Sequence, residues 1–285
     1  MVEARPAVLT VSALRFLVGV VLSMPVTGPA DPLKVAQGTA AWVLSIFAIY
    51  LFNGVNDVAE DRVNGSTRPI AWGALDPRSA SYVAAAAAAL ALGATLDLPA
   101  PMTGIIGANL VLGYLYSGPP APLKESSCAT VAVLVVSGLL SYLGGFTIAS
   151  GGQAVAAPTG LLVFAALSVG WMTLVGVPAK DLSDCAGDAA AGRRTIVVTR
   201  GARAATWFMS VSASLLVVGV FAAVALLGAA LLGVALAALA GAVAVIGAGR
   251  RVRSGWTERR EQRRPYRAFM VTQHLVHITA LISGI

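Results

Sequence analysis

Two long stretches without a charged residue constrain most strongly what this chain can fold into. They run from 126 to 179 and from 204 to 249. Crossing a bilayer takes about 20 apolar residues in an α-helix, so each stretch is long enough for two membrane spans. Hydrophobic residues make up 57% of the 285 residues, and charged residues 12%. A soluble globule needs a largely polar surface, so this composition indicates a polytopic membrane protein.

We predict an all-α bundle of nine transmembrane helices. The expected spans are 8–27, 37–55, 79–97, 100–117, 127–149, 157–178, 204–227, 229–249 and 267–285. The whole chain should form one transmembrane domain. Its parts would be two four-helix halves and a ninth helix, at about 8–124, 127–249 and 267–285.

The connections between the expected spans alternate in charge, which predicts an orientation. Connections after the odd-numbered spans hold only Asp31, Lys34 and Asp97 as ionised residues. Cytoplasmic loops carry the excess of Lys and Arg, so the N-terminus and the even-numbered loops should face the cytoplasm. The loop 250–267 contains eight arginines, which we interpret as an orientation signal that also touches anionic lipid.

This orientation predicts an integral protein of the cell membrane with its polar site on the cytoplasmic side. The bias towards Arg, Ala, Gly and Val suggests a bacterial inner membrane. We expect membrane lipids as neighbours, but no nucleic acid and no obligate protein partner. Cys128 and Cys185 are interpreted as small apolar fillers, and His274 and His277 as polar packing positions in the last span.

Nearly half of the acidic residues lie in two short windows, 53–62 and 180–188. On a helix, residues spaced by three or four positions share one face. The residues so spaced are Asn53, Asp57 and Asp61 in the first window and Asp181, Asp184 and Asp188 in the second. Aligned carboxylates repel one another unless a counter-charge is present. A solvated helix end is the alternative for one window alone.

Hard divalent cations can supply that counter-charge. Mg²⁺ accepts a few carboxylates and fills its other positions with water and phosphate oxygens. Two facing windows would hold Mg²⁺ ions that a diphosphate bridges, and the ions would stabilise the leaving diphosphate. We therefore expect the five aspartates to be catalytic, and all five together with Asn53 to be metal ligands.

An internal correspondence relates the two windows. An offset of 127 residues places Asp57 on Asp184 and Asp61 on Asp188. Both windows follow an even-numbered expected span. Two related four-helix halves would explain this correspondence.

Basic residues on the same side of the membrane are candidates for binding a diphosphate, because arginine binds phosphate bidentately and lysine acts as a point charge. They are Arg62, Arg68, Lys124, Lys180, Arg193 and Arg194. Lys124 and Lys180 are the strongest of these. The proline-rich segment 118–122 either ends the fourth span or aims Tyr116, Ser117 and Lys124 into the site.

At these residues the sequence resembles the UbiA superfamily of intramembrane prenyltransferases. Asn53, Asp57 and Asp61, followed by Arg68 and a proline, match the family's first acidic motif. The second motif, with its trailing Gly-Arg-Arg-Thr, is complete at Asp181–Asp188 and 192–195. The segment from Tyr116 to Lys124 looks like the family's span-four motif. Gly54 is a departure, because the family often has Asp directly after the first Asn.

The resemblance implies a nine-helix bundle with a cytoplasm-facing cavity, where Mg²⁺-bound isoprenyl diphosphate ionises to an allylic cation. In the first hypothesis an aromatic or other lipophilic acceptor, such as a lipid, captures the cation. In the second, which the pair Glu60-Asp61 also suggests, the protein is a terpene cyclase and an alkene of farnesyl or geranylgeranyl diphosphate captures it. A transporter or binding protein without chemistry is the third hypothesis, but the charges lie at one interface rather than at the midplane.

Overall fold

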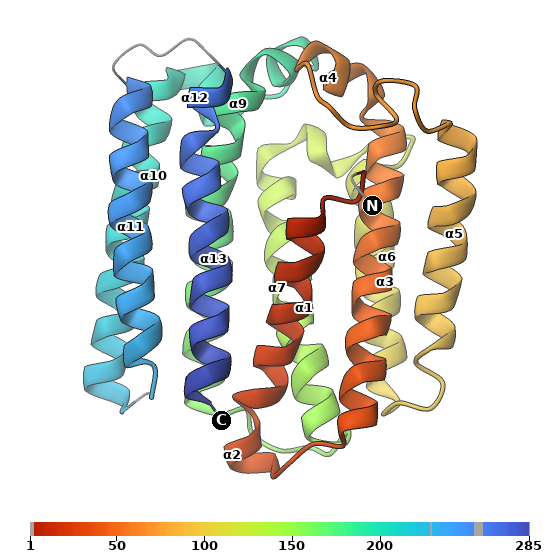
Figure 1. The fold of residues 1–285 in the computed structure, drawn as a ribbon, viewed down its shortest axis with the longest axis vertical. Coiled ribbons are helices and arrows are strands. Elements are labelled where there is room, and N and C mark those ends of the chain that lie inside the picture. Colours follow the sequence, from red (N-terminus) through yellow and green to blue (C-terminus); the bar gives the residue numbers. More distant parts are fainter. Residues whose placement is uncertain (1–2, 229, 254–258, 285) are drawn as a thin grey trace. The chain divides into compact units, whose positions relative to one another are not determined.

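A computed structural model describes residues 3–228, 230–253 and 259–284, and all regular secondary structure in these ranges is helical (Figure 1). The membrane-length and shorter helices are α1 (Pro6–Val21), α2 (Met24–Thr27), α3 (Pro32–Asn56), α4 (Val58–Val63), α5 (Pro77–Gly93), α6 (Pro101–Ser117), α7 (Ser127–Ala149), α8 (Thr159–Gly170), α9 (Val177–Ala190), α10 (Ile196–Leu227), α11 (Leu232–Arg253), α12 (Arg259–Gln262) and α13 (Arg264–Ser283). Two short segments are a 3-10 turn, η1 (Leu123–Glu125), and a π-helical segment, η2 (Trp171–Gly176). The all-α class is confirmed.

The chain divides into two compact units, which are described separately. The first comprises Met1–Lys124 and Val136–Leu161, and the second comprises Glu125–Val135 and Leu162–Ile285. The division passes through α7 and α8, so each of these helices contributes to both units. The expected division into halves and a ninth helix stays a prediction.

Prolines and acidic caps begin many of the helices. Proline stands in the first two positions of α1, α3, α5, α6 and α13, where its missing N–H costs no helical hydrogen bond. Asp31 accepts a hydrogen bond from the Leu33 N–H at 2.9 Å, and Asp76 from the Ser79 N–H at 2.8 Å. These carboxylates satisfy backbone donors that the first helical turn leaves free.

In the first unit α3 packs against α1, α5 and α6. The rings of Phe16 and Trp42 stack with centroids 6.5 Å apart, and both are fully buried. Glycines allow α1 and α7 to approach closely: a Cβ on Gly19 would lie 2.6 Å from the carbonyl oxygen of Tyr142. Small residues at such crossings are typical of helix packing in membranes.

In the second unit α11 packs against α10 and α13, and α9 packs against α10. From Thr159 to Ala190 the chain is helical throughout, because η2 joins α8 to α9. η2 ends at Gly176, two residues before Pro178, whose nitrogen cannot donate a helical hydrogen bond. Such π segments accompany interruptions of this kind in helices. The expected span 157–178 therefore ends earlier than the helix does.

Within the described residues, six helical segments are long and apolar enough to cross a membrane. They are Pro6–Thr27, Pro32–Asn56, Ser127–Ala149, Thr159–Ala190, Ile196–Leu227 and Leu232–Val252. α5 and α6 have 17 residues each and are not among them, nor is α13. The count of nine spans stays a prediction, and the arginine-rich loop falls partly outside the described residues.

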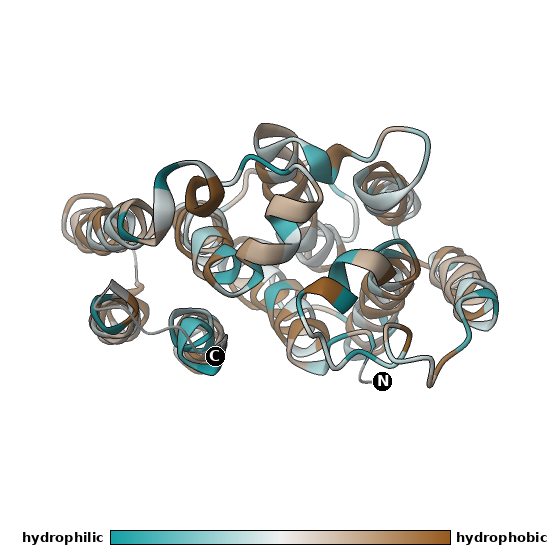
Figure 2. Cartoon of the chain, turned by 90° about the horizontal axis from the view of Figure 1, so that it is seen from above, coloured by the Kyte–Doolittle hydropathy of each residue, from teal (hydrophilic) through white to brown (hydrophobic). Residues whose placement is uncertain are grey.

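Large apolar side chains lie exposed on the helices, as expected for contact with lipid. Leu226 on α10 is 82% exposed, and Tyr82 on α5 is 77% exposed. Hydrophobic residues, brown in Figure 2, recur along the helices of both units. Large apolar side chains exposed on so many helices suit contact with a bilayer.

Candidate functional site

The first acidic window lies where α3 ends and α4 begins. Asp57 ends α3 and also precedes α4. The Asp57 N–H donates to the Asn53 carbonyl at 2.9 Å, and the Asp61 N–H donates to the Asp57 carbonyl at 2.8 Å. Because these bonds continue the helical pattern across the junction, Asn53, Asp57 and Asp61 stay in one line, as their spacing predicts.

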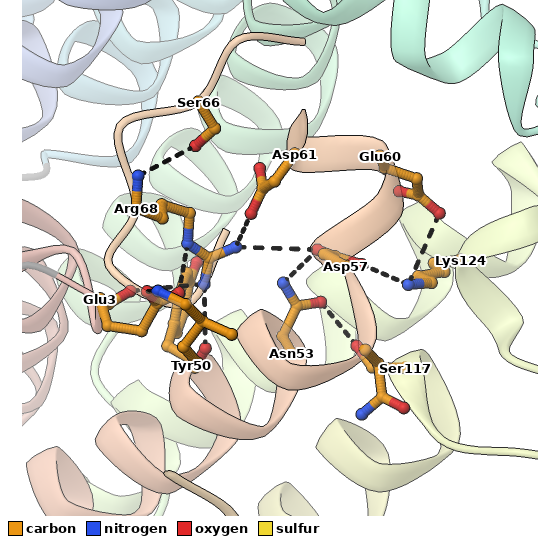
Figure 3. A network of polar contacts seen from close by, with 12 residues as sticks. Glu3, Tyr50, Asn53, Asp57, Glu60, Asp61, Ser66, Arg68, Ser117 and Lys124 are labelled. Carbon is orange, nitrogen blue, oxygen red and sulfur yellow. Dashed lines mark hydrogen bonds and ion pairs between the residues drawn. The ribbon is translucent and has the colours of Figure 1, made fainter. Parts of the chain in front are cut away.

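Ser117 and Lys124 reach this line from the end of α6 and from η1. The Ser117 hydroxyl donates to Asn53 Oδ1 at 2.6 Å, and Asn53 Nδ2 donates to Asp57 Oδ2 at 2.5 Å (Figure 3). Lys124 Nζ pairs with Asp57 Oδ1 and lies 3.8 Å from Glu60 Oε1. The proline-rich turn after α6 thus brings Ser117 and Lys124 to the acidic residues, and Glu60 faces Lys124.

Arg68 approaches the same line from the loop after α4. Its Nη1 is 2.8 Å from Asp61 Oδ2 and 3.9 Å from Asp57 Oδ2. Its Nε is 2.6 Å from Glu3 Oε1, and its Nη2 donates to the Tyr50 carbonyl at 3.3 Å. Burial of the Arg68 side chain, which is 7% exposed, makes these contacts strong, because little water competes for the charge.

Two other predicted site residues of the first unit contribute less directly. Arg62 is exposed, and its Nε donates to the Ala71 carbonyl at 3.0 Å, which ties α4 to the following loop. Tyr116 is half-buried on α6, directly before Ser117. The structure therefore brings Ser117, Lys124 and Arg68 to the line of Asn53, Asp57 and Asp61. The Arg62 side chain instead binds a backbone carbonyl.

The second acidic window forms the end of α9. Lys180 Nζ lies 2.8 Å from Asp184 Oδ2 one turn further along the helix, and the Ser183 hydroxyl lies 3.2 Å from Asp184 Oδ1. Asp188, of which 3% is exposed, pairs with Arg193 Nη1 at 3.1 Å. Carboxylates of the second window are therefore also held beside cations.

The turn after α9 holds the remaining residues of the second window. The Arg193 N–H donates to the Asp188 carbonyl at 2.8 Å, and Gly192 adopts a φ of +72°, which favours glycine. Arg194 is exposed, and its carbonyl accepts a hydrogen bond from the Ser127 hydroxyl at 3.1 Å. Asp181 is half-buried one turn before Asp184.

The donor chemistry of both windows fits Mg²⁺. Their acidic side chains offer carboxylate oxygens, and hard divalent cations prefer such ligands. In the part of the chain that the structure describes, no three His, Cys, Asp or Glu side chains gather closely enough to hold one metal ion. Asp57, Asp61, Asp184 and Asp188 each lie instead beside a Lys or Arg, so binding of a cation would require the side chains to rearrange.

The histidines contact backbone carbonyls of their own helix, α13. His277 is fully buried, lies edge-on to Phe164 and is bonded through Nδ1 to the Gln273 carbonyl at 2.6 Å. His274 Nδ1 contacts the Met270 carbonyl at 2.7 Å. Cys128 and Cys185 are free thiols.

Sequence reasoning missed Glu3. This side chain reaches the first acidic window from a position 50 residues earlier in the chain, with no motif around it to mark it. The only signal was indirect: Gly54 stands where the second window has the carboxylate of Asp181. The space beside Gly54 is where Glu3 lies.

Solved proteins that share the fold of this chain include two UbiA homologues. A UbiA homologue from Archaeoglobus fulgidus bound to GPP and Mg²⁺ has a TM-score of 0.68 at 19% identity, over 99% of this chain and 97% of that chain. An apo UbiA homologue from Aeropyrum pernix K1 has a TM-score of 0.70 at 19% identity, over 97% of this chain and 98% of that chain. At such identity the likeness concerns the fold alone.

Curated relatives are similar in sequence over part of their length. Digeranylgeranylglyceryl phosphate synthase of Halobacterium salinarum (strain R1) is 35% identical over 204 residues, 70% of this chain and 67% of that protein. The protein of the same name from Natronomonas pharaonis is 31% identical over 176 residues, 62% of this chain and 60% of that protein. The profile of the UbiA prenyltransferase family matches residues 13–272. The chain belongs to the UbiA prenyltransferase family.

Proposed function

We propose that this protein ionises an isoprenyl diphosphate in the presence of Mg²⁺ and transfers the prenyl group to a lipophilic acceptor. The observation that carries the proposal is the line of Asn53, Asp57 and Asp61, on which the cations of Lys124 and Arg68 converge. A diphosphate site needs carboxylate oxygens for a hard cation and basic groups for phosphate oxygens, and this line offers both. Family membership supports the reaction class.

The proposed Mg²⁺ ligands come from both acidic windows. They are Asn53, Asp57, Asp61, Asp181, Asp184 and Asp188. When bound, Mg²⁺ supplies a Lewis acid that neutralises the negative charge growing on the leaving diphosphate. A solved UbiA homologue of the same fold is bound to GPP and Mg²⁺, which supports a role for Mg²⁺ in the proposed reaction.

The basic and polar residues around these carboxylates would bind the diphosphate oxygens. They are Arg62, Arg68, Lys124, Lys180, Arg193 and Arg194, together with Asn53, Tyr116 and Ser117. The ion pairs of Asp57, Asp61, Asp184 and Asp188 orient these carboxylates before substrate arrives. We expect Lys124 and Lys180 to contact phosphate oxygens when the substrate binds, in place of their present partners Asp57 and Asp184. The two aspartates could then bind the cation.

The transfer breaks one bond and forms another. The bond between the allylic carbon and the diphosphate oxygen breaks, and its electron pair leaves with the diphosphate. An acceptor hydroxyl oxygen then forms the new bond to that carbon and loses its proton. The apolar helices would limit capture of the allylic cation by water.

The names of the relatives suggest the chemical class of the acceptor. They are synthases of digeranylgeranylglyceryl phosphate, a glyceryl phosphate that carries two geranylgeranyl groups. We propose that this chain likewise prenylates the hydroxyl of a glyceryl phosphate that already carries one prenyl group. The cytoplasmic orientation and the nine-span architecture predicted from the sequence belong to the same proposal.

The test is product analysis with purified protein, Mg²⁺ and geranylgeranyl diphosphate in four parallel reactions. One contains geranylgeranylglyceryl phosphate, one contains 4-hydroxybenzoate as an aromatic acceptor, one has no acceptor, and one has the first acceptor with EDTA. We expect a doubly prenylated glyceryl phosphate in the first reaction alone. A cyclic terpene without acceptor, or an aromatic product only, would overturn the proposal.

A further inference from the structure

Gly54 lies inside α3 at a position where a larger residue would collide with its neighbours. A Cβ at this position would clash with Glu3 Oε1 and would lie 2.7 Å from Arg68 Nη2. Glycine inside a helix lowers helix stability relative to alanine, so helix propensity does not explain it. The close approach of Glu3 and Arg68 does explain it.

Glu3 fills this space with a buried carboxylate. Its side chain is 4% exposed, and its two oxygens have different partners. Oε1 lies 2.6 Å from Arg68 Nε (Figure 3). Oε2 accepts a hydrogen bond from the Ile70 N–H at 3.0 Å. The Glu3 backbone carbonyl accepts from Arg68 Nη2 at 3.4 Å. The segment before α1 is therefore fixed to the loop that carries Arg68.

The internal correspondence between the two acidic windows, an offset of 127 residues, pairs Gly54 with Asp181. The first window thus lacks a carboxylate that the second window has. Glu3 brings a carboxylate to the same place through space. We propose that Glu3 replaces the carboxylate missing at position 54 and acts as a positioning residue for Arg68. The inference rests on the proposed function, because it assigns Arg68 to the diphosphate and Mg²⁺ site.

The role of Glu3 follows from how the Arg68 guanidinium is shared. The Glu3 carboxylate is paired with Nε of Arg68. Nη1 of Arg68 lies 2.8 Å from Asp61 Oδ2 and 3.9 Å from Asp57 Oδ2. Without Glu3, the whole buried positive charge of Arg68 would be balanced by Asp57 and Asp61. Arg68 would then compete with Mg²⁺ for these two carboxylates. Glu3 therefore keeps them available to the cation.

The first test is a stability cycle, which requires no substrate. Thermal unfolding in detergent is measured for wild type, Glu3→Ala, Gly54→Asp and the double variant. We expect Gly54→Asp to lower Tm by about 5 °C when Glu3 is present, because the new side chain overpacks the site and places a second carboxylate beside that of Glu3. In the Glu3→Ala background the same substitution should leave Tm unchanged or raise it. Gly93→Asp is the matched control, since a Cβ there meets no atom within 4 Å.

The second test is the dependence on Mg²⁺. Glu3→Gln should raise the Mg²⁺ concentration for half-maximal diphosphate release about tenfold or more, with kcat at saturating Mg²⁺ little changed, because the lost contact is a buried ion pair to Arg68. The Mg²⁺ concentration that produces half of the Mg²⁺-induced increase in Tm should rise in parallel. The variant Glu3→Ala/Gly54→Asp should restore both values towards those of wild type. Asp97→Asn, which removes an exposed acidic charge from the same unit, should change neither.

The outcomes separate this inference from the proposed function. An equal Tm loss for Gly54→Asp in both backgrounds would overturn the replacement of one carboxylate by the other. A wild-type Mg²⁺ response in Glu3→Gln, in the Tm measurement, would overturn the positioning role. If wild type binds Mg²⁺ but releases no diphosphate from any isoprenyl diphosphate, the proposed function fails, while the two Tm measurements still decide the role of Glu3.

Discussion

Replacing Lys124 by Met removes the buried cation that pairs with Asp57. The Lys124 side chain is 6% exposed and that of Asp57 is 15% exposed. The Asp57 carboxylate that remains after the substitution is therefore only partly hydrated. Breaking a buried ion pair by removing one partner costs about 3–5 kcal/mol. We expect the lower end, about 3 kcal/mol of unfolding free energy, because Asn53 Nδ2 still donates to Asp57 at 2.5 Å and Arg68 stays 3.9 Å away.

The converse substitution, Asp57→Asn, leaves Lys124 with Glu60 at 3.8 Å as a distant acidic partner. We expect a similar loss of about 3 kcal/mol. The double variant Lys124→Met/Asp57→Asn has neither charge. Its cost should therefore be about 2 kcal/mol smaller than the sum of the two single costs, because directly paired residues are energetically coupled.

The assay is unfolding by SDS titration in mixed micelles, followed by tryptophan fluorescence. Lys34→Met, which removes an exposed lysine from the start of α3, is the control and should change the unfolding free energy by less than about 0.5 kcal/mol. Additive effects of the two substitutions, within about 0.5 kcal/mol, would refute the argument that Lys124 and Asp57 form one buried pair.

Further predictions concern packing, substrate binding and pH. Gly19→Ala should cost about 1–3 kcal/mol in the same titration, because its Cβ would lie 2.6 Å from the Tyr142 carbonyl oxygen, and Gly104→Ala, in open space, should cost nothing. Lys180→Gln should raise the KM for isoprenyl diphosphate about tenfold with a smaller effect on kcat, and an unchanged KM would exclude a phosphate contact. The Ser79 N–H lowers the pKa of Asp76, so the capping contribution of Asp76 is complete above the ordinary aspartate pKa and is lost as pH falls through the lowered value. The dependence of Tm on acidic pH should therefore be shallower in Asp76→Ala, and an identical profile would count against the cap.

Continuous apolar length predicted the helices well where charges do not interrupt it. The expected span 127–149 coincides with α7, and 204–227 ends where α10 ends. Hydropathy marks the part of a helix that suits lipid, however, rather than the end of its hydrogen bonding. The helix from Thr159 to Ala190 therefore passes the expected end at 178, and the pair Lys180–Asp184 supports its polar last turns.

Regular spacing also predicted which polar residues of the first window share a line, because the helical pattern continues through Asp57. It could not predict contacts made by a residue far away in the chain. Glu3 has no neighbours that form a motif, and its partner Arg68 lies 65 residues away. Such a contact depends on how the segment before α1 packs, which local sequence does not encode.

The central claim is that the two acidic windows bind a Mg²⁺-dependent diphosphate substrate, and diphosphate release tests it most directly. Release from geranylgeranyl diphosphate would be measured for wild type, Asp57→Asn, Asp184→Asn and the control Asp97→Asn, each checked for folding by thermal unfolding. We expect wild type and the control to release diphosphate only with Mg²⁺, and each window variant to be at least about 100-fold slower, because charge stabilisation in the transition state is lost. Rates equal to wild type in both folded window variants would contradict the claim.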